Sequence, residues 1–595
     1  MVTPSLGGAW WLMLPGAAPE PPPDWPVIAR HSSGRAWLVG EPGPVLTAKV
    51  GEVKAAAIGD VLAEPGEFAD ALHRAVAHRD YDALTGFAGS YQLLVSEPGR
   101  MLAYSDAAGL RRVYTARYGR AVVAGDRARV LAAVRGAGPD PEWTAGRMCA
   151  PAVPGPVRET RSPYEGVTPV PAGCRAELAG EQPAGITRYW HPPSAEAPLR
   201  DGAVRLREAL ENAIAGRVRH VGGPVTVELS GGLDSAALAA LAVRAVGAEQ
   251  VRLVTTPSRT SGDLPWARLI AEHLGACHEV LDDSPELFAD LPNAVPSHTD
   301  EPPAAVGAAR LAHTVSALAR AGSRVHLNGQ GGDEVLGAPL SHLGLLLRQR
   351  HHGAVRLLRG HAALHATSAV ELARHALSSQ PHWQWLREAA ECLDGDVDPI
   401  RDAVAWEAYP RMAPWASPHA RRLVTDALAV SEVEPWGERT VHAALARVRT
   451  SAAAAATYGQ AMTALGGPPV VFPFFDRPVV EACLTVRPEA RSDPWVFKPL
   501  LAEAMRDVLP EALLARTTKG SYTPDIHRGW ARHRARVLDL VRSPALAELG
   551  LVEPDRLHRA LVGWGAAGLP PAYVTDLLTL ELWTRTTDVV RQEAL

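Results

Sequence analysis

The stretch VELSGGLDS, residues 227–235, decides the fold of this 595-residue chain. The apolar run 225–230 predicts a buried strand, and the run 235–246 after the glycines predicts a helix. In a parallel sheet, a turn of this kind lies at the carboxyl end of the strand, where ligands bind. The stretch therefore predicts a ligand-binding loop between a strand and a helix.

Most polar groups of this loop suit a phosphate. Gly231 and Gly232 allow the backbone to approach an anion and to point N–H groups at it. The helix amino terminus adds about half a positive charge, and Ser230 and Ser235 can donate hydroxyl hydrogen bonds. Asp234 would repel phosphate unless a cation lay between them, so we expect it to bind Mg²⁺. A glycine-rich turn without a ligand is the alternative interpretation.

The surrounding pattern indicates a parallel sheet. Further strands are predicted at 251–256, 277–282 and 324–329, and helices at 204–218, 263–275 and 313–322. Strands that alternate with helices are typical of βαβ units, in which helices cover both faces of the sheet. Beyond about residue 340 the chain reads mostly as helix.

A second loop repeats the design of the first. LNGQGGDE, residues 327–334, also runs from a strand through glycines into carboxylates. If its strand ends beside the first loop, Asp333 lies opposite Asp234 across one Mg²⁺ ion, which usually takes one or two protein carboxylates. The alternative is a solvated turn.

The first 187 residues have a different pattern. Short strands with Gly/Pro turns are expected at 35–40, 90–106 and 120–125, with a helix at 66–79. These elements predict an α+β domain over 1–187. The unpatterned, proline-containing segment 188–200 is predicted as a linker, and 201–595 as the α/β domain.

Composition excludes several classes of protein. Net charge is −5 with mixed signs, which argues against nucleic-acid binding. No apolar run is long enough to span a bilayer, and residues 5–15 read as a buried strand rather than a signal peptide. The five cysteines lack CxxC spacing, so we expect no cysteine metal site and a cytoplasmic location.

SGGLDS resembles the pyrophosphate loop of the N-type ATP pyrophosphatases, in which the products are AMP and pyrophosphate. In order, SGGLDS, GQGGDE, FPFFDRPVVEA (472–482) and ARTTKG (515–520) are similar to the synthetase domain of the asparagine synthetase class B superfamily. That resemblance implies ATP and Mg²⁺ as cofactors and Lys519 as the catalytic residue over the phosphates. It also implies a site made of Leu229, Ser230, Gly231, Gly232, Asp234, Ser235, Gly329 and Lys519 for the nucleotide, and Asp234 and Asp333 for the metal.

Two departures from the superfamily pattern narrow the function expected of this chain. Some members carry Glu or Tyr where this chain has Gln330, which cannot act as a base; Glu407 is a possible helper. GFAGSY (86–91) and SDAAGLR (105–111) are similar to the Ntn-type glutaminase half, whose amino-terminal Cys attacks glutamine. Here Val2 takes that position, and Thr3 and Ser5 would need processing, so we expect a retained fold without glutaminase activity.

Two synthetase families also lack glutaminase activity in this domain, the β-lactam synthetases and the lasso-peptide cyclases. Three stretches look more like the cyclases: 412–423, 457–466 and 516–534. This resemblance implies adenylation of an Asp or Glu side chain in a precursor peptide, and closure of a macrolactam by the peptide's amino terminus. It also implies a leader peptidase and a leader-binding protein as partners, with no nucleic acid and no membrane.

Other functions stay open. The chain could be a small-molecule amide ligase like the β-lactam or asparagine synthetases, or an inactive scaffold that binds nucleotide. Basic stretches at 348–359 and 528–536 would fit a peptide substrate, although solvated helix faces are the favoured explanation for them.

Overall fold

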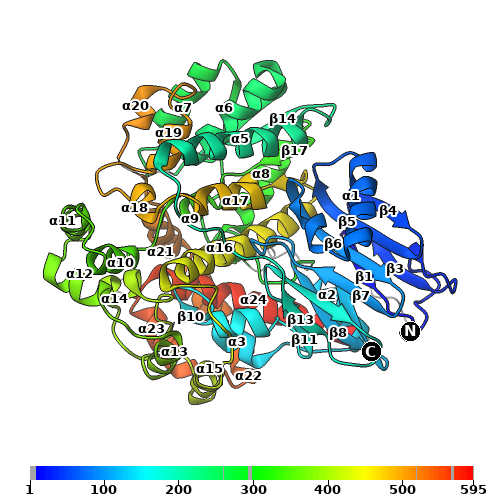
Figure 1. Ribbon diagram of the computed structural model, residues 1–595. Coiled ribbons are helices and arrows are strands. Elements are labelled where there is room, and N and C mark those ends of the chain that lie inside the picture. Colours follow the sequence, from blue (N-terminus) through cyan, green and yellow to red (C-terminus); the bar gives the residue numbers. More distant parts are fainter. Residues whose placement is uncertain (1–7, 259, 292–297, 518, 565–568, 594–595) are drawn as a thin grey trace.

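Two six-stranded antiparallel sheets form the first part of the chain in the computed structural model, which describes residues 8–593 apart from 259, 292–297, 518 and 565–568 (Figure 1). The first sheet has the order β11 (Val167–Val170), β8 (Val113–Tyr118), β9 (Ala121–Gly125), β1 (Trp10–Met13), β3 (Ala36–Glu41), β2 (Val27–Arg30). The second has the order β13 (Gly185–Arg188), β12 (Cys174–Leu178), β7 (Arg100–Tyr104), β6 (Gly89–Glu97), β5 (Val53–Val61), β4 (Val45–Val50).

These sheets pack face to face, and a helix covers each outer face. Trp11 of the first sheet and Leu94 of the second lie in one buried cluster. Helix α1 (Pro65–His78) packs Phe68 against the second sheet, and α2 (Ala128–Arg135) packs Leu131 against the first. The layered α+β arrangement confirms the predicted class, and buried β1 confirms the first predicted strand over its described residues.

A five-stranded parallel sheet follows, as predicted. Its order is β16 (Cys277–Val280), β15 (Val251–Thr255), β14 (Val225–Glu228), β17 (Val325–Leu327), β19 (Val470–Val471). The chain runs outward from β14 to β16 and then returns to place β17 on the other side of β14. Strand order therefore reverses between β14 and β17, which is where ligands bind in such sheets.

Helices flank this sheet and form the rest of the chain, which confirms the predicted helical part. Those next to the first strands are α5 (Leu199–Val218), α6 (Leu233–Val246), α7 (Leu264–Leu274) and α8 (Ala308–Arg320). Later ones include α9 (Gly332–Leu336), α10 (His342–Arg348), α11 (Ala354–Leu364), α12 (Ala369–Ala376), α13 (His382–Glu391), α14 (Pro399–Val404), α15 (Pro418–Ala429), α16 (Arg439–Ala464), α17 (Arg477–Leu484), α18 (Pro488–Arg491), α19 (Pro499–Ala504), α21 (Thr523–Leu540) and α24 (Pro571–Glu593). Within the described ranges, none is long and apolar enough to cross a membrane.

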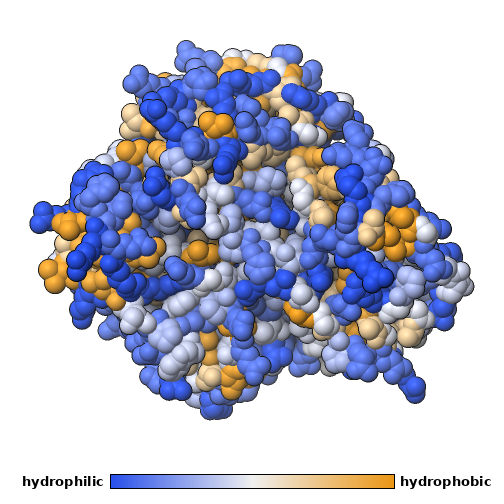
Figure 2. All heavy atoms as spheres, in the orientation of Figure 1, coloured by the Kyte–Doolittle hydropathy of each residue, from blue (hydrophilic) through white to orange (hydrophobic). Residues whose placement is uncertain are grey.

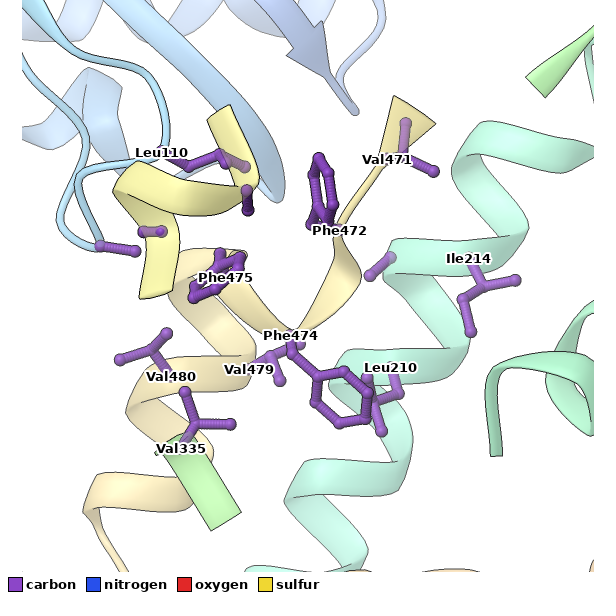
Figure 3. Close-up of a cluster of buried hydrophobic side chains, with 14 of the residues drawn as sticks. Leu110, Leu210, Ile214, Val335, Val471, Phe472, Phe474, Phe475, Val479 and Val480 are labelled. Atoms are coloured by element: carbon purple, nitrogen blue, oxygen red, sulfur yellow. The ribbon is translucent and has the colours of Figure 1, made fainter. Parts of the chain in front are cut away.

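The two parts of the chain share a continuous buried core. Leu110, in the loop between β7 and β8, belongs to the same cluster as Phe472 and Phe475, which follow β19 (Figure 3). At the other end of the interface, Trp583 of α24 packs against Trp143. Residues 189–198 join β13 to α5 with only a single β-bridge, and the division at 188–200 stays a prediction.

Candidate active site

The first glycine-rich loop joins β14 to α6 and closes on itself. Gly231 has a φ of +83°, and a side chain there would lie 2.4 Å from the backbone oxygen of Asp263, so the turn needs glycine. The hydroxyl oxygens of Ser230 and Ser235 lie 3.1 Å apart and hold the turn together. Among the described residues no side chain caps α6. Its first N–H groups are therefore left to bind an anion.

Glycines also let the second loop pack directly on the first. A side chain at Gly329 would lie 3.2 Å from the backbone nitrogen of Ser235. One at Gly332 would lie 2.5 Å from the carboxyl carbon of Asp234. These glycines therefore allow α9 to begin beside α6, so that Asp333 comes opposite Asp234.

The carboxylates of Asp234 and Asp333 share a single ammonium group. Lys498 donates a hydrogen bond to Asp234, and its Nζ lies 2.6 Å from Oδ1 of Asp333. Lys519 contacts the other oxygen of Asp333. The structure thus brings together Asp234, Asp333 and Lys519, the three residues to which the sequence assigned metal binding and catalysis.

Burial and these contacts together lower the pKa of Asp333 and raise the pKa values of Asp234 and Lys519. Burial raises the pKa of Asp333, but Lys498 and Lys519 outweigh burial and bring that pKa down to about 2. For Asp234, burial raises the pKa, and the attraction of Lys498 does not fully offset it. Burial lowers the pKa of Lys519, but Asp333 outweighs this and raises it. Asp333 and Lys519 are therefore both charged at neutral pH.

Lys498 is the residue of this cluster that sequence reasoning missed. It precedes α19 in a left-handed conformation, with a φ of +49°, and its side chain is 8% exposed. A signal was present, because the chain has only four lysines, Lys49, Lys54, Lys498 and Lys519, among 60 basic residues. Where arginine is so strongly preferred, a lysine indicates a need for a compact ammonium group.

A small cleft lies between the first loop and these cations. Its volume is about 40 Å³. It is lined by Ser230, Gly232, Leu233, Asp234, Phe497, Lys498, Leu513, Arg516 and Lys519. Helix amino terminus, hydroxyl and cations converge there, which is the environment that a phosphate group needs.

Asp263 ties this cleft together. Its carboxylate pairs with Arg516, which also donates to the carbonyl oxygen of Gly231 at 2.8 Å. The same carboxylate accepts the N–H of Gly520 at 3.2 Å. Asp263 therefore holds the segment of Lys519 against the first loop, a role that the sequence did not reveal.

Leu229, by contrast, offers little to a ligand. Its side chain is fully buried. Its N–H donates to Val254 at 2.8 Å, and its carbonyl accepts the Thr255 hydroxyl at 2.6 Å. Because its polar groups are used within the sheet, Leu229 holds the loop in position and can give a nucleotide only nonpolar contact.

The carboxylate pair fits a divalent cation. Oδ1 of Asp234 is buried and has no hydrogen-bond partner among the described residues. The ammonium of Lys498 already neutralises both carboxylates from one position, so one cation can reach both. Over the described residues no cluster of three or more His, Cys, Asp or Glu could hold a metal alone. Phosphate and water oxygens would complete the coordination, as is usual for Mg²⁺.

A large cavity opens beside this cluster. Its volume is about 1060 Å³, and Asp333, Lys498 and Lys519 are among the residues that line it. Its walls are mostly small or apolar and include Pro151, Ala152, Val153, Pro154, Ala338, Pro339, Leu340, Leu364, Ala443, Ala446, Thr450, Ala454, Trp495 and Val496. Apolar side chains also gather on the surface over α11 and α12, where Val355, Leu364 and Val370 are exposed (Figure 2).

Neither Gln330 nor Glu407, which both line the cavity, is suited to act as a base. The side-chain amide of Gln330 donates to the carbonyl oxygen of Ser451 at 3.2 Å. Glu407 is buried between Arg158 at 3.4 Å and His442 at 3.3 Å. Burial alone would raise its pKa, but Arg158 and His442 lower it to about 2, so Glu407 is a poor base. The suggestion that Glu407 helps proton removal is therefore disfavoured.

No residue of 348–359 or 528–536 belongs to the described lining of this cavity, although Arg356 pairs with the lining residue Asp493 at 3.9 Å. Arg348 donates to the carbonyl oxygens of Leu377 and Ser378, and Arg532 pairs with Glu286 at 3.2 Å. These contacts favour solvated helix faces. Val2, Thr3 and Ser5, which bear on glutaminase activity, lie outside the described residues.

Comparison with known proteins gives a family and several partial relatives. The family model for asparagine synthase matches residues 205–585. The carboxyethyl-arginine beta-lactam-synthase of Streptomyces clavuligerus is 32% identical over 231 residues, which cover 38% of this chain and 42% of that protein. A putative glutamine-hydrolyzing asparagine synthetase of Mycobacterium bovis is 34% identical over 194 residues, 30% of this chain and 28% of that protein. The chain thus spans less than half the length of these curated relatives.

Among solved structures, similarity is low. The allosteric regulatory enzyme of purine biosynthesis has 11% identity and a TM-score of 0.20, over 43% of this chain and 69% of that one. The glutamine-dependent NAD⁺ synthetase of Acinetobacter baumannii, in complex with ADP, has 19% identity and a TM-score of 0.18, over 37% of this chain and 43% of that one.

The family match is more extensive. It spans well over half of the chain and contains both glycine-rich loops, the paired carboxylates and both lysines of the site. This chain therefore belongs to the asparagine synthase family.

Proposed function

We propose that this chain is an ATP-dependent ligase that closes a macrolactam ring in a precursor peptide. An Asp or Glu side chain of the peptide is adenylated with release of pyrophosphate, and the peptide's amino terminus then displaces AMP. The observation that carries the proposal is the cavity of about 1060 Å³ that opens on Asp333 and Lys519. Pockets for small molecules are usually about 300–1,000 Å³, so this cavity has room for a substrate larger than one amino acid.

The residues of the site support the activation step. Backbone N–H groups of the first loop and the start of α6 would bind the departing pyrophosphate. Lys519 and Lys498 would balance the charge that develops as it leaves. Asp234 and Asp333 would hold Mg²⁺, which supplies neutralisation of the phosphate oxygens.

The second step depends on placement. AMP is a good leaving group, so the amine needs only to be held beside the acyl carbon. Gln330 and Glu407 are poor bases, so the amine's proton passes to another group, to the substrate or to solvent. Intramolecular placement can contribute roughly 7–11 kcal/mol. In this proposal, the main task of the cavity is to fold the peptide.

Mass spectrometry tests the proposal directly. Peptides with one Asp or Glu at successive positions are incubated with enzyme, ATP and Mg²⁺, and matched peptides with Asn or Gln serve as controls. The proposal predicts loss of one water from an acidic peptide together with formation of AMP. If AMP forms and every acidic peptide keeps its mass, macrolactam formation is refuted.

A second candidate is ring closure on a small molecule. The similarity to a carboxyethyl-arginine beta-lactam-synthase favours it over intermolecular amide formation. Carboxyethyl-arginine offered in place of peptide distinguishes the two, because only this candidate predicts its dehydration. If the chain is an inactive scaffold that only binds nucleotide, no AMP should form with either substrate.

A further inference from the structure

Two arginines border the large cavity without an ion pair to any described carboxylate, and they differ in how their guanidinium groups are used. Arg491 is 4% exposed and donates to the carbonyl oxygens of Val335 at 3.1 Å and Gly337 at 3.0 Å. It is therefore committed to holding the end of α9. Arg447, on α16, is exposed to the cavity. No carboxylate oxygen of the described chain lies within 4.0 Å of its guanidinium, and no described side chain hydrogen bonds to it.

The position of Arg447 on α16 brings it close to the second glycine-rich loop. Cavity-lining residues recur along α16 at helical spacing: Ala443, Ala446, Arg447, Thr450, Ser451 and Ala454. On this face Arg447 is the long side chain among small ones. It lies one turn, about 5.4 Å, before Ser451, whose carbonyl holds Gln330 of the second loop. Arg447 is also near enough to Glu334 for its charge to act on that carboxyl group.

Apart from Glu334, which feels the charge of Arg447 without forming an ion pair with it, the other acidic side chains of the cavity wall are paired. Asp402 lies 3.5 Å from Arg411, and Asp493 lies 3.9 Å from Arg356. Asp333 and Glu407 are paired with lysines and with Arg158, as described above. A cation without such a partner, beside a cavity, is suited to an anion that arrives with the substrate.

A substrate carboxylate that approaches Arg447 also meets Glu334 in the same wall, whereas the charge of Asp333 is balanced by Lys498 and Lys519. The substrate carboxylate therefore needs a positive group to hold it, and a guanidinium can bind a carboxylate through two parallel hydrogen bonds. We propose that Arg447 binds a carboxylate of the substrate in this cavity and so selects acidic substrates. This inference rests on the proposed function, in which the cavity holds the molecule that is activated.

Two carboxylates of a peptide could be the one that Arg447 binds, the side-chain group to be activated or the carboxyl terminus. The test measures pyrophosphate exchange into ATP with an acidic peptide that the wild-type enzyme dehydrates, for wild type, Arg447→Gln and Arg447→Lys. Arg422→Gln is the matched control, since Arg422 is an exposed arginine of α15 outside the cavity lining.

The expected result for Arg447→Gln is a rise of at least tenfold in the KM for peptide, with the KM for ATP and the melting temperature unchanged. Arg447→Lys recovers part of the loss, and Arg422→Gln behaves as wild type. Amidation of the peptide's carboxyl terminus distinguishes the sources. If Arg447 binds the carboxyl terminus, amidation should remove the difference in peptide KM between wild type and Arg447→Gln. If Arg447 binds the side chain, that difference should remain.

Two failures are distinguishable. If wild type exchanges pyrophosphate and Arg447→Gln keeps a peptide KM within twofold, the role of Arg447 is refuted while the proposed function stands. If wild type shows no exchange with any acidic peptide, the proposed function fails, and the inference that rests on it fails with it.

Discussion

Replacement of Lys519 by alanine should separate catalysis from folding. The Lys519 side chain is 53% exposed, and its ion pair is with Asp333, which keeps Lys498 as a second partner. Exposed ion pairs contribute about 0–1 kcal/mol to stability. We therefore expect Lys519→Ala to unfold within about 1 kcal/mol of wild type in urea.

The effect on turnover should be much larger. Lys519 lines the cleft of the first loop, where a phosphate group would leave with its negative charge. Loss of one such directed interaction typically costs roughly 3–4 kcal/mol in the transition state. That corresponds to a fall in rate of at least about a hundredfold.

The assay is AMP release with an acidic peptide, ATP and Mg²⁺, measured with wild type, Lys519→Ala and Lys49→Ala. Lys49 is an exposed lysine of β4, remote in the fold from the parallel sheet, and its replacement should leave AMP release unchanged. Turnover by Lys519→Ala within threefold of wild type would show that this lysine does not stabilise the departing phosphates.

Three further predictions concern the charges around the site. Lys498→Met leaves two carboxylates without their shared cation and should lower the free energy of unfolding by about 3–5 kcal/mol, as measured by urea denaturation. Added Mg²⁺ should restore part of this lost stability, and no recovery would argue against a shared metal. Asp234→Asn and Asp333→Asn should each abolish pyrophosphate exchange rather than slow only the amide step, and exchange at the wild-type rate in either variant would contradict metal binding there. Glu407 has a folded pKa of about 2, below its usual 4.5, so its contribution to stability is present above about pH 4.5 and is lost as the pH falls toward 2; the difference in unfolding free energy between wild type and Glu407→Gln should therefore shrink over that range, and a constant difference would refute the pairing.

Much of the fold could be predicted because its signals are local. Apolar runs followed by glycines mark the ends of β14 and β17, and Gly231 and Gly332 are required by close contacts at those ends. Since carboxyl ends of neighbouring parallel strands meet at one edge, the approach of Asp333 to Asp234 follows from the same pattern.

Contacts between distant segments could not be predicted in this way. Lys498 is separated from Asp234 by 264 positions, and its immediate sequence neighbours give no indication that it belongs to the site. Asp263 likewise acts on Arg516, 253 positions away. Such residues gain their roles from how α7, α19 and the segment before α21 pack together, which depends on the whole core.

The sequence was also a poor guide to the basic groups of the cavity. The arginine runs in 348–359 and 528–536 would fit a peptide substrate because their positive charge is dense, yet such density is more typical of solvated helix faces. Arg447 and Arg491 lie outside these runs and line the cavity because of their helical positions. Leu229 was grouped with the nucleotide ligands through its place in the loop motif, although its side chain lies in the core.

The central claim, activation of a peptide side chain as an adenylate, is tested most directly by isotope transfer. A peptide carrying ¹⁸O in the carboxyl group of its acidic side chain is incubated with the enzyme, unlabelled ATP and Mg²⁺, and the nucleotide and phosphate products are analysed by mass spectrometry. Attack of the carboxylate on the α-phosphorus places one labelled oxygen in AMP, which is the result that we predict. Label in inorganic phosphate would instead indicate an acyl phosphate and would contradict the assignment of residues 230–235 as a pyrophosphate-binding loop.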